Sequence, residues 1–203
     1  MKDIVFLRHG KVVRLEEKRI YGNTDILLHV EGVEKTLRAG EYLKKDHFDA
    51  IYCSPLTRAV HSLQNVMKSV SCDWPEPIFD ARLKEMHFGR AEMKTHEEIE
   101  REMPELKAAM AKDYLAVQFP EGESLPILYD RVHRFLQEEI LGKTAERILV
   151  VAHSGVIRTA LCSLLHVDLN HYWDYFIDFG GIVRVRIEGD MQHAMIRALN
   201  END

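Results

Sequence analysis

The chain has 203 residues, 46% of them hydrophobic and 30% charged, which can form a sizeable core under an ordinary polar surface. Its net charge of −6 argues against a general binder of nucleic acids or anionic membranes. No apolar stretch approaches the roughly 20 residues that span a bilayer, and the run at residues 4–7 is too short for a signal peptide. The three cysteines contain no C-x-x-C pair, so we expect reduced thiols in a cytoplasmic protein.

Short apolar runs alternate with longer amphipathic runs along the chain. The apolar runs predict buried strands at residues 4–7, 50–54 and 147–153. The amphipathic runs predict helices at residues 31–45, 55–70, 95–117, 123–141 and 155–167. Pro104 is expected to break the third of these helices. Residues 182–199 alternate on both sides of Gly189-Asp190, which indicates a hairpin.

This order of elements predicts an α/β fold in one domain over residues 1–203. We expect a three-layer α/β/α sandwich with a mostly parallel sheet and an antiparallel edge hairpin. The hairpin would offer a sheet edge to a second copy of the chain, so a homodimer is one predicted assembly. Ligands of such sheets bind beyond the carboxyl ends of the strands.

Cationic and imidazole side chains stand at three of these strand ends. Arg8 and His9 follow the first strand, Arg58 lies just after the second, and His153 follows the third. Paired guanidinium groups are suited to an anion with several oxygen atoms. A neutral imidazole beside that anion can attack phosphorus, and a second imidazole can stabilise the developing charge. The four side chains together therefore indicate phosphoryl chemistry.

A leaving alkoxide must also be protonated. Glu85 stands in an irregular stretch beside Leu83, Phe88 and Gly89, where we expect it to be half-buried. Glu85 is therefore the candidate acid.

Four motifs now resemble one family: "LRHG", "SPLTRA", "LKEMHFG" and "VVAHSG" occur here in the order seen in the histidine phosphatase superfamily, also called the phosphoglycerate-mutase-like family. The resemblance implies that His9 is a nucleophile that forms phosphohistidine. It implies that Arg8, Arg58 and His153 bind the phosphoryl group. It also implies that Glu85 protonates the leaving group and then activates water, with no metal or other cofactor.

Further contacts with the substrate are expected from the resemblance. The "YGNTD" segment resembles a loop that closes over phosphate, so the backbone of Gly22 and the side chain of Asn23 are candidate contacts. Ser154, directly after His153, is another candidate. Lys11 stands where members of the family often have Glu or Gln, and it could contact phosphate as a point charge. An insertion over about residues 90–120 is expected to form a helical cap.

The resemblance gives a metal-independent phosphomonoesterase acting on a small phosphorylated metabolite. The family's small members include enzymes that resemble α-ribazole phosphatase and broad sugar-phosphate phosphatases. The match in chain size and in "YGNTD" makes the former a candidate, with α-ribazole 5′-phosphate as one candidate substrate. A phosphoglycerate-type mutase is the alternative enzyme. A protein that binds phosphorylated ligands without turning them over is the alternative outside enzymes.

Overall fold

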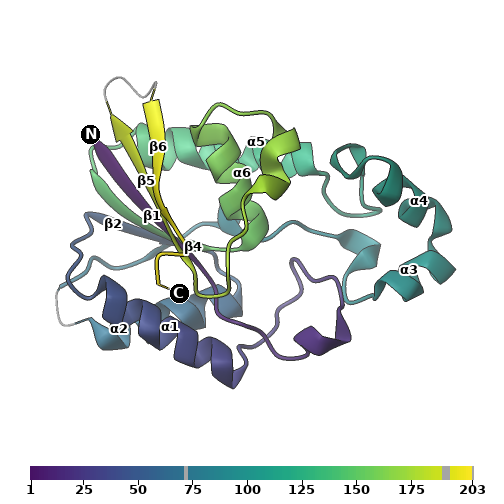
Figure 1. Cartoon of the computed structure of the whole chain (residues 1–203), viewed down its shortest axis with the longest axis horizontal. Helices are drawn as coiled ribbons and strands as arrows, with labels where there is room; N and C mark the ends of the chain where they lie inside the picture. Colours follow the sequence, from purple (N-terminus) through teal and green to yellow (C-terminus); the bar gives the residue numbers. More distant parts are fainter. Residues whose placement is uncertain (71–72, 189–192, 203) are drawn as a thin grey trace.

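The computed structural model describes residues 1–70, 73–188 and 193–202, and its centre is one mixed sheet (Figure 1). The strands of the sheet run in the order β3-β2-β4-β1-β5-β6. Their bounds are β1 Lys2–Arg8, β2 Ala50–Cys53, β3 Ile78–Phe79, β4 Arg147–Ala152, β5 Ile182–Glu188 and β6 His193–Leu199. The first four are mutually parallel where they pair, whereas β5 runs antiparallel to β1 and β6 antiparallel to β5.

Six α-helices are described around this sheet. They are α1 Val30–Leu43, α2 Thr57–Ser69, α3 His96–Glu102, α4 Pro104–Lys112, α5 Leu125–Phe135 and α6 Ser154–Leu164. Shorter helical segments are η1 Leu15–Glu17, η2 Ala81–Leu83, η3 Gly89–Ala91, η4 Tyr114–Ala116, the π-helix η5 Leu136–Leu141 and η6 Leu169–Asp174. No helix among the described residues is long and apolar enough to cross a membrane.

Helices cover both faces of the sheet, and the side chains of β1 show how. Successive residues of a strand point to opposite faces. Ile4 and Phe6 belong to the core that includes α5 and α6, whereas Val5 and Leu7 belong to the core that includes α1 and α2. All four side chains are at least 97% buried. This arrangement confirms the predicted three-layer sandwich with a mostly parallel sheet and antiparallel strands at one edge.

The predicted elements are present, with different bounds and one interruption. Pro55 precedes α2 by two residues, because Leu56 keeps an extended backbone before the helix starts. The predicted helix at residues 95–117 is broken at Met103, and Pro104 starts α4 at a position where its missing N–H needs no partner. The short strand β3 was not predicted. The predicted turn at Gly189-Asp190 lies outside the described residues.

The helices α3 and α4 project from one end of the sandwich, away from the sheet (Figure 1). A capping box fixes the start of α3: the side chain of Thr95 accepts a hydrogen bond from the Glu98 N–H, and the Glu98 carboxylate accepts one from the Thr95 N–H. The segment lies within the range predicted for a cap, and its role over the site stays a prediction.

The segment after β1 packs against α1 through two glycines that face each other. A Cβ atom on Gly10 would lie 2.3 Å from the Gly32 carbonyl oxygen, and one on Gly32 would lie 2.1 Å from the Lys11 carbonyl oxygen. Backbone therefore touches backbone here, and only glycine allows that approach. This contact holds the residues that follow His9 against the first turn of α1.

Gly32→Ala should therefore destabilise the protein by about 1–3 kcal/mol, the usual range for overpacking. Helix propensity alone predicts the opposite sign, a gain of about 1 kcal/mol. Urea unfolding measures the difference. The control Arg38→Ala changes an exposed residue of the same helix and should stay within about 0.5 kcal/mol of wild type. A stabilised Gly32→Ala protein would show that the contact is not tight.

Candidate active site

The predicted site residues converge beyond the carboxyl ends of three neighbouring strands. Arg8 ends β1 and His9 follows it, His153 follows β4, and Arg58 lies in the first turn of α2 after β2. The ring centres of His9 and His153 are 5.0 Å apart. Pairing of β4 between β1 and β2 brings these ends together, which confirms the predicted convergence at one edge of the sheet.

The ring of His9 is buried and its tautomer is set by one hydrogen bond. Nδ1 lies 2.8 Å from the Gly10 carbonyl oxygen. Since a carbonyl can only accept, Nδ1 carries the ring proton and Nε2 presents its lone pair. Burial, and then the charges of Arg58 and Arg8, hold the pKa of His9 well below 6.5. Gly10 is itself fixed because its N–H donates to Ser62 Oγ at 3.0 Å.

His153 is also buried, and only one of its nitrogens has a partner in the protein. Its Nε2 lies 2.7 Å from Ser54 Oγ, whereas its Nδ1 is buried without a hydrogen-bond partner. Burial lowers the pKa of His153 well below its usual value, and the charge of Arg58 adds to this effect. When the Ser54 hydroxyl donates to Nε2, the ring proton resides on Nδ1, which can then donate to a ligand.

Arg58 is fully buried, and neutral groups hold it. One Nη donates to the Gly22 carbonyl oxygen at 2.5 Å and the other to the Thr24 carbonyl oxygen at 2.9 Å. Burial lowers the pKa of the Arg58 guanidinium, although carboxylates nearby, Glu85 first among them, oppose the shift. The two carbonyls orient the guanidinium without neutralising it.

Arg8 is held in a similar way on the other side of the site. Its Nη1 donates to the Ile177 carbonyl oxygen at 2.6 Å, and its guanidinium carbon lies 3.7 Å from the ring centre of Phe179. A cation over an aromatic face at this distance is attracted to it. The positive charge of Arg8 therefore also remains available to an anion.

Four buried side-chain atoms in the described part of the chain lack a hydrogen-bond partner: Arg8 Nε, Arg58 Nε, His153 Nδ1 and Asn23 Oδ1. All four belong to residues that the sequence predicted for the site. Such orphaned atoms are rare in folded proteins. Both Nε–H groups can only donate, and half a turn of the Asn23 amide would present its NH₂ group. A ligand with several oxygen acceptors would satisfy these groups, as an oxyanion does.

Glu85 reaches the site from the segment that follows β3. It is half-buried, as predicted, and its carboxylate accepts hydrogen bonds from the N–H groups of Gly155 and Met86, each at 3.0 Å. A Cβ atom on Gly155 would lie 2.3 Å from Glu85 Oε1. Glycine at the start of α6 therefore lets the carboxylate approach the residues beside His153.

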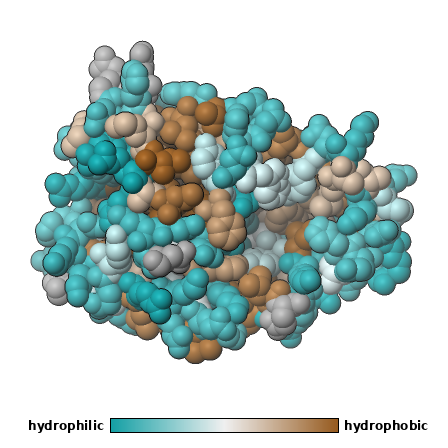
Figure 2. Space-filling view, in the orientation of Figure 1, coloured by the Kyte–Doolittle hydropathy of each residue, from teal (hydrophilic) through white to brown (hydrophobic). Residues whose placement is uncertain are grey.

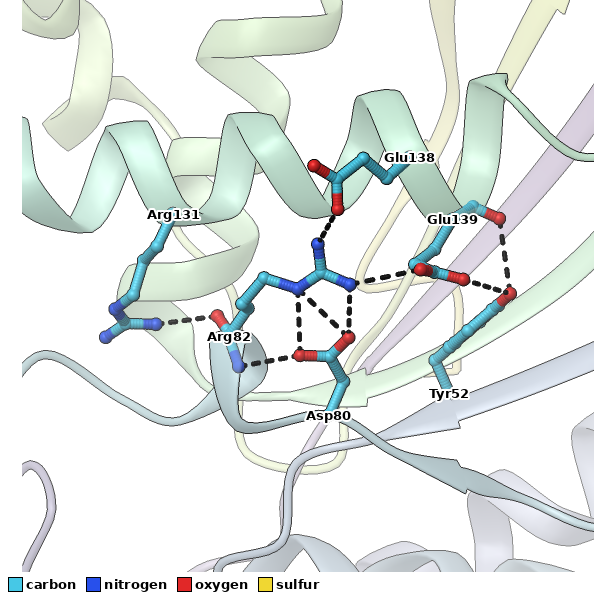
Figure 3. A network of polar contacts seen from close by, with 6 residues as sticks. All are labelled: Tyr52, Asp80, Arg82, Arg131, Glu138 and Glu139. Atoms are coloured by element: carbon cyan, nitrogen blue, oxygen red, sulfur yellow. Dashed lines mark hydrogen bonds and ion pairs between the residues drawn. The ribbon is translucent and has the colours of Figure 1, made fainter.

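Two arginines fix the backbone that carries Glu85 (Figure 3). Arg82 binds the Asp80 carboxylate through Nε and Nη2, and also pairs with Glu138 and Glu139. Arg131, on α5, donates to the carbonyl oxygens of Arg82 at 2.7 Å and of Glu85 at 3.1 Å. Glu85 is therefore positioned by α5 and the π-helix η5 that continues it, not by its own irregular segment alone.

Glu92, which sequence reasoning missed, organises the loop that contains Gly22. Its carboxylate accepts from the N–H groups of Gly22 at 3.0 Å, Asn23 at 2.9 Å and Thr24 at 3.1 Å, and from Phe88 N–H at 3.0 Å. Burial acts to raise the pKa of Glu92, but these hydrogen bonds outweigh burial and lower it. The only sequence signal was an acidic residue just after the "FGRA" stretch.

The other residues that were predicted to contact the substrate are Gly22, Lys11 and Ser154. Both backbone groups of Gly22 are used inside the protein, the N–H by Glu92 and the carbonyl by Arg58. The Lys11 ammonium lies 2.6 Å from the Glu31 carboxylate at the start of α1, so it is paired outside the cluster of His9 and His153. Ser154 begins α6 beside His153 and is half-buried. Contact of these three residues with substrate stays a prediction.

Glu92→Gln should weaken the binding of inorganic phosphate about tenfold, or about 1.4 kcal/mol. The amide nitrogen of Gln cannot accept the loop N–H groups, so the loop would no longer hold Arg58 as firmly. Isothermal titration calorimetry measures the affinity. Glu98→Gln is the matched control. Like Glu92, Glu98 accepts a backbone N–H, but it does so in the capping box of α3, where it also pairs with Arg19. Equal phosphate affinity in wild type and Glu92→Gln would contradict this role.

The two buried histidines should make the protein less stable in mild acid. Their pKa values are lowered on folding, so below about pH 6.5 the unfolded chain binds more protons than the folded protein. The two histidines should therefore not reduce the free energy of unfolding above pH 6.5, and this free energy should fall as the pH drops below 6.5. Urea unfolding at pH 7.5 and pH 5.5 measures this, and His153→Gln should show a smaller drop. An equal drop in that variant would show that His153 does not cause it.

Comparisons with known proteins agree with this geometry. Residues 4–201 match the histidine phosphatase superfamily (branch 1). Phosphoglycerate mutase-like protein 4 of Arabidopsis thaliana is 34% identical over 77% of this chain and 68% of its own. Adenosylcobalamin/alpha-ribazole phosphatase of Escherichia coli is 27% identical over 96% and 93%. The crystal structure of the alpha-ribazole phosphatase from Shigella flexneri superposes with a TM-score of 0.91 at 26% identity, over 98% and 96% of the two chains. The chain belongs to the histidine phosphatase superfamily.

Proposed function

We propose that this phosphatase hydrolyses a small phosphomonoester through a phosphohistidine at His9. The observation that carries the proposal is the set of donors around that ring. Arg8, Arg58 and His153 converge at one edge of the sheet, and each has a buried nitrogen without a hydrogen-bond partner. His9 Nε2 presents its lone pair because Nδ1 donates to the Gly10 carbonyl. A phosphoryl group supplies the oxygen atoms that these donors need.

In the first step, His9 Nε2 attacks phosphorus and a P–N bond forms while the P–O bond to the leaving group breaks. The two guanidinium groups and His153 Nδ1 stabilise the negative charge on the phosphoryl oxygen atoms. Glu85, in its protonated form, gives its proton to the leaving oxygen. An alcohol departs, and the Glu85 carboxylate remains.

In the second step, that carboxylate takes a proton from a water molecule, whose oxygen attacks phosphorus. The P–N bond breaks and inorganic phosphate leaves, so His9 is again neutral and Glu85 is again protonated. One acid thus serves in both steps. The low pKa of His9 supports this cycle, because the ring starts in the form that can attack.

We further propose that no metal or cofactor takes part. The guanidinium groups of Arg8 and Arg58 already supply two positive charges next to the phosphoryl group, held by carbonyl oxygens rather than carboxylates. Activity should therefore persist in EDTA.

The free, buried thiols of Cys53 and Cys162 support a cytoplasmic location, where thiols stay reduced.

Hydrolysis is favoured over the mutase alternative by the extent of the similarities. The E. coli α-ribazole phosphatase aligns over 96% of this chain and 93% of its own, whereas the 2,3-bisphosphoglycerate-dependent phosphoglycerate mutase of Elusimicrobium minutum aligns over 83% and 79%. α-Ribazole 5′-phosphate is accordingly the first named substrate to test in a panel of phosphorylated metabolites. A homodimer through the edge strand β6 stays a prediction.

His9→Ala should abolish hydrolysis of p-nitrophenyl phosphate while inorganic phosphate still binds, because only the nucleophile is removed. Release of p-nitrophenol measures turnover, and calorimetry measures binding. Retained turnover would show that another group attacks. Phosphate binding without turnover on any substrate, in the wild-type protein, would favour the non-catalytic alternative.

Glu85→Gln provides the matched comparison. p-Nitrophenol leaves readily without an acid, so the first step should continue in this variant. Attack by water lacks its base, so phosphorylated His9 should accumulate and give a burst of one p-nitrophenol per site. Mass spectrometry of the quenched protein detects the added phosphoryl group. A uniform loss with no burst would contradict the second role of Glu85.

A further inference from the structure

A cavity of about 410 Å³ lies between α4 and the η6 segment. We call it the aromatic cavity, because Phe88, Tyr114 and Trp173 line it together with Ile20 and Met110. Figure 2 shows the surface hollowed between the sandwich and the projecting α3–α4 end, with hydrophobic side chains at its edges. His96 and Lys107 add two basic side chains to the lining.

The walls of the aromatic cavity adjoin Glu85. Phe88 follows Glu85 by three residues, and Ile20 directly precedes the loop that starts at Tyr21. Tyr114 is close enough to Glu85 that the carboxylate, after burial, helps to raise its pKa to about 12. The cavity is therefore next to the candidate acid.

Trp173, on the far wall of the aromatic cavity, is connected to Glu85 through the neighbouring residue Tyr172. The Tyr172 hydroxyl would lie 3.0 Å from a Cβ atom on Gly155, the same point that approaches Glu85 Oε1 to 2.3 Å. Trp173 packs edge to face against Tyr172, with ring centres 4.9 Å apart, and against Tyr114 at 5.3 Å. These ring contacts connect the far wall of the cavity to the acid.

The direction of the reaction decides what this cavity can hold. Attack on phosphorus proceeds in line, so the leaving oxygen lies opposite His9 and next to the acid that protonates it. The organic part of the ester must then extend past Glu85. The aromatic cavity lies next to Glu85, so it is the space that we assign to this organic part.

We propose, resting on the phosphatase function above, that the aromatic cavity binds a flat apolar or heteroaromatic ring carried by the leaving alcohol. Aromatic side chains favour a ring through edge-to-face contact and burial of apolar surface. A sugar or amino acid in the same place would leave hydroxyl or charged groups against mainly apolar walls, where few polar side chains could bind them. The enzyme therefore selects phosphomonoesters whose alcohol bears such a ring a few bonds from the phosphate.

Two esters with alcohols of similar acidity test this directly: 3-phenylpropyl phosphate and propyl phosphate. The readout is the ratio of their kcat/KM values. Because the two alcohols have similar acidity, this ratio reports binding of the ring rather than a difference in leaving-group chemistry. Wild type should prefer the phenyl ester about tenfold or more, as expected for burying a ring. A ratio near one, with both esters hydrolysed, would overturn the inference and leave the phosphatase function intact. Failure to hydrolyse any phosphomonoester would overturn the phosphatase function itself.

Variants of Trp173 test whether the ring of the ester binds in the aromatic cavity. Trp173→Ala removes a wall residue that is 54% exposed, and it should reduce the preference severalfold, whereas Trp173→Phe should keep most of it. Phe176→Ala is the matched control, because Phe176 is an exposed aromatic residue nearby that does not line the cavity. An unchanged preference in Trp173→Ala would show that the ring binds elsewhere and would overturn the inference.

Discussion

Two guanidinium groups lie buried beside two imidazoles, and the structure around the site depends on how their charge is accommodated. A buried charge is expensive unless hydrogen bonds replace its lost water. Here Arg58 and Arg8 donate those bonds mainly to backbone carbonyls, on the loop at residues 22–24 and at Ile177. Carbonyl dipoles stabilise a cation but do not cancel its charge. The site therefore keeps a positive potential for an incoming anion.

The same charge sets the state of the imidazoles. A proton on His9 would add a third positive charge to a desolvated site, and this repulsion joins burial in lowering its pKa. The two arginines thus keep positive charge in the site and also keep the His9 ring neutral. His153 responds to the same field, so its Nδ1 acts as a neutral hydrogen-bond donor rather than as a third cation.

Much of the site could be predicted from the sequence because parallel strands place their carboxyl ends together. That rule joined His9, Arg58 and His153 without any knowledge of the intervening chain. It carries no information about segments that pack from the side. Ile177 and Phe179 reach Arg8 because the chain turns there into β5, which lies antiparallel beside β1.

Other features depended on contacts that no local pattern encodes. Glu92 looks like a surface carboxylate in the sequence, yet it is half-buried under a loop that lies far away in the chain. The pairing of Lys11 with Glu31 was not predicted, because it follows from the close contact of Gly10 with Gly32, which brings the first turn of α1 beside Lys11. Fold class depends on periodic patterns, whereas these details depend on which irregular segments meet.

The close approach of Gly22 to the segment of the acid has a mechanical consequence. A Cβ atom on Gly22 would lie only 1.7 Å from the Met86 carbonyl oxygen, and Glu92 bonds both to Gly22 and to Phe88. The loop that orients Arg58 and the segment that carries Glu85 are thus held together by a direct backbone contact and by the Glu92 carboxylate. Any displacement of this loop would therefore also disturb the segment that carries Glu85, so the positions of Arg58 and Glu85 depend on each other.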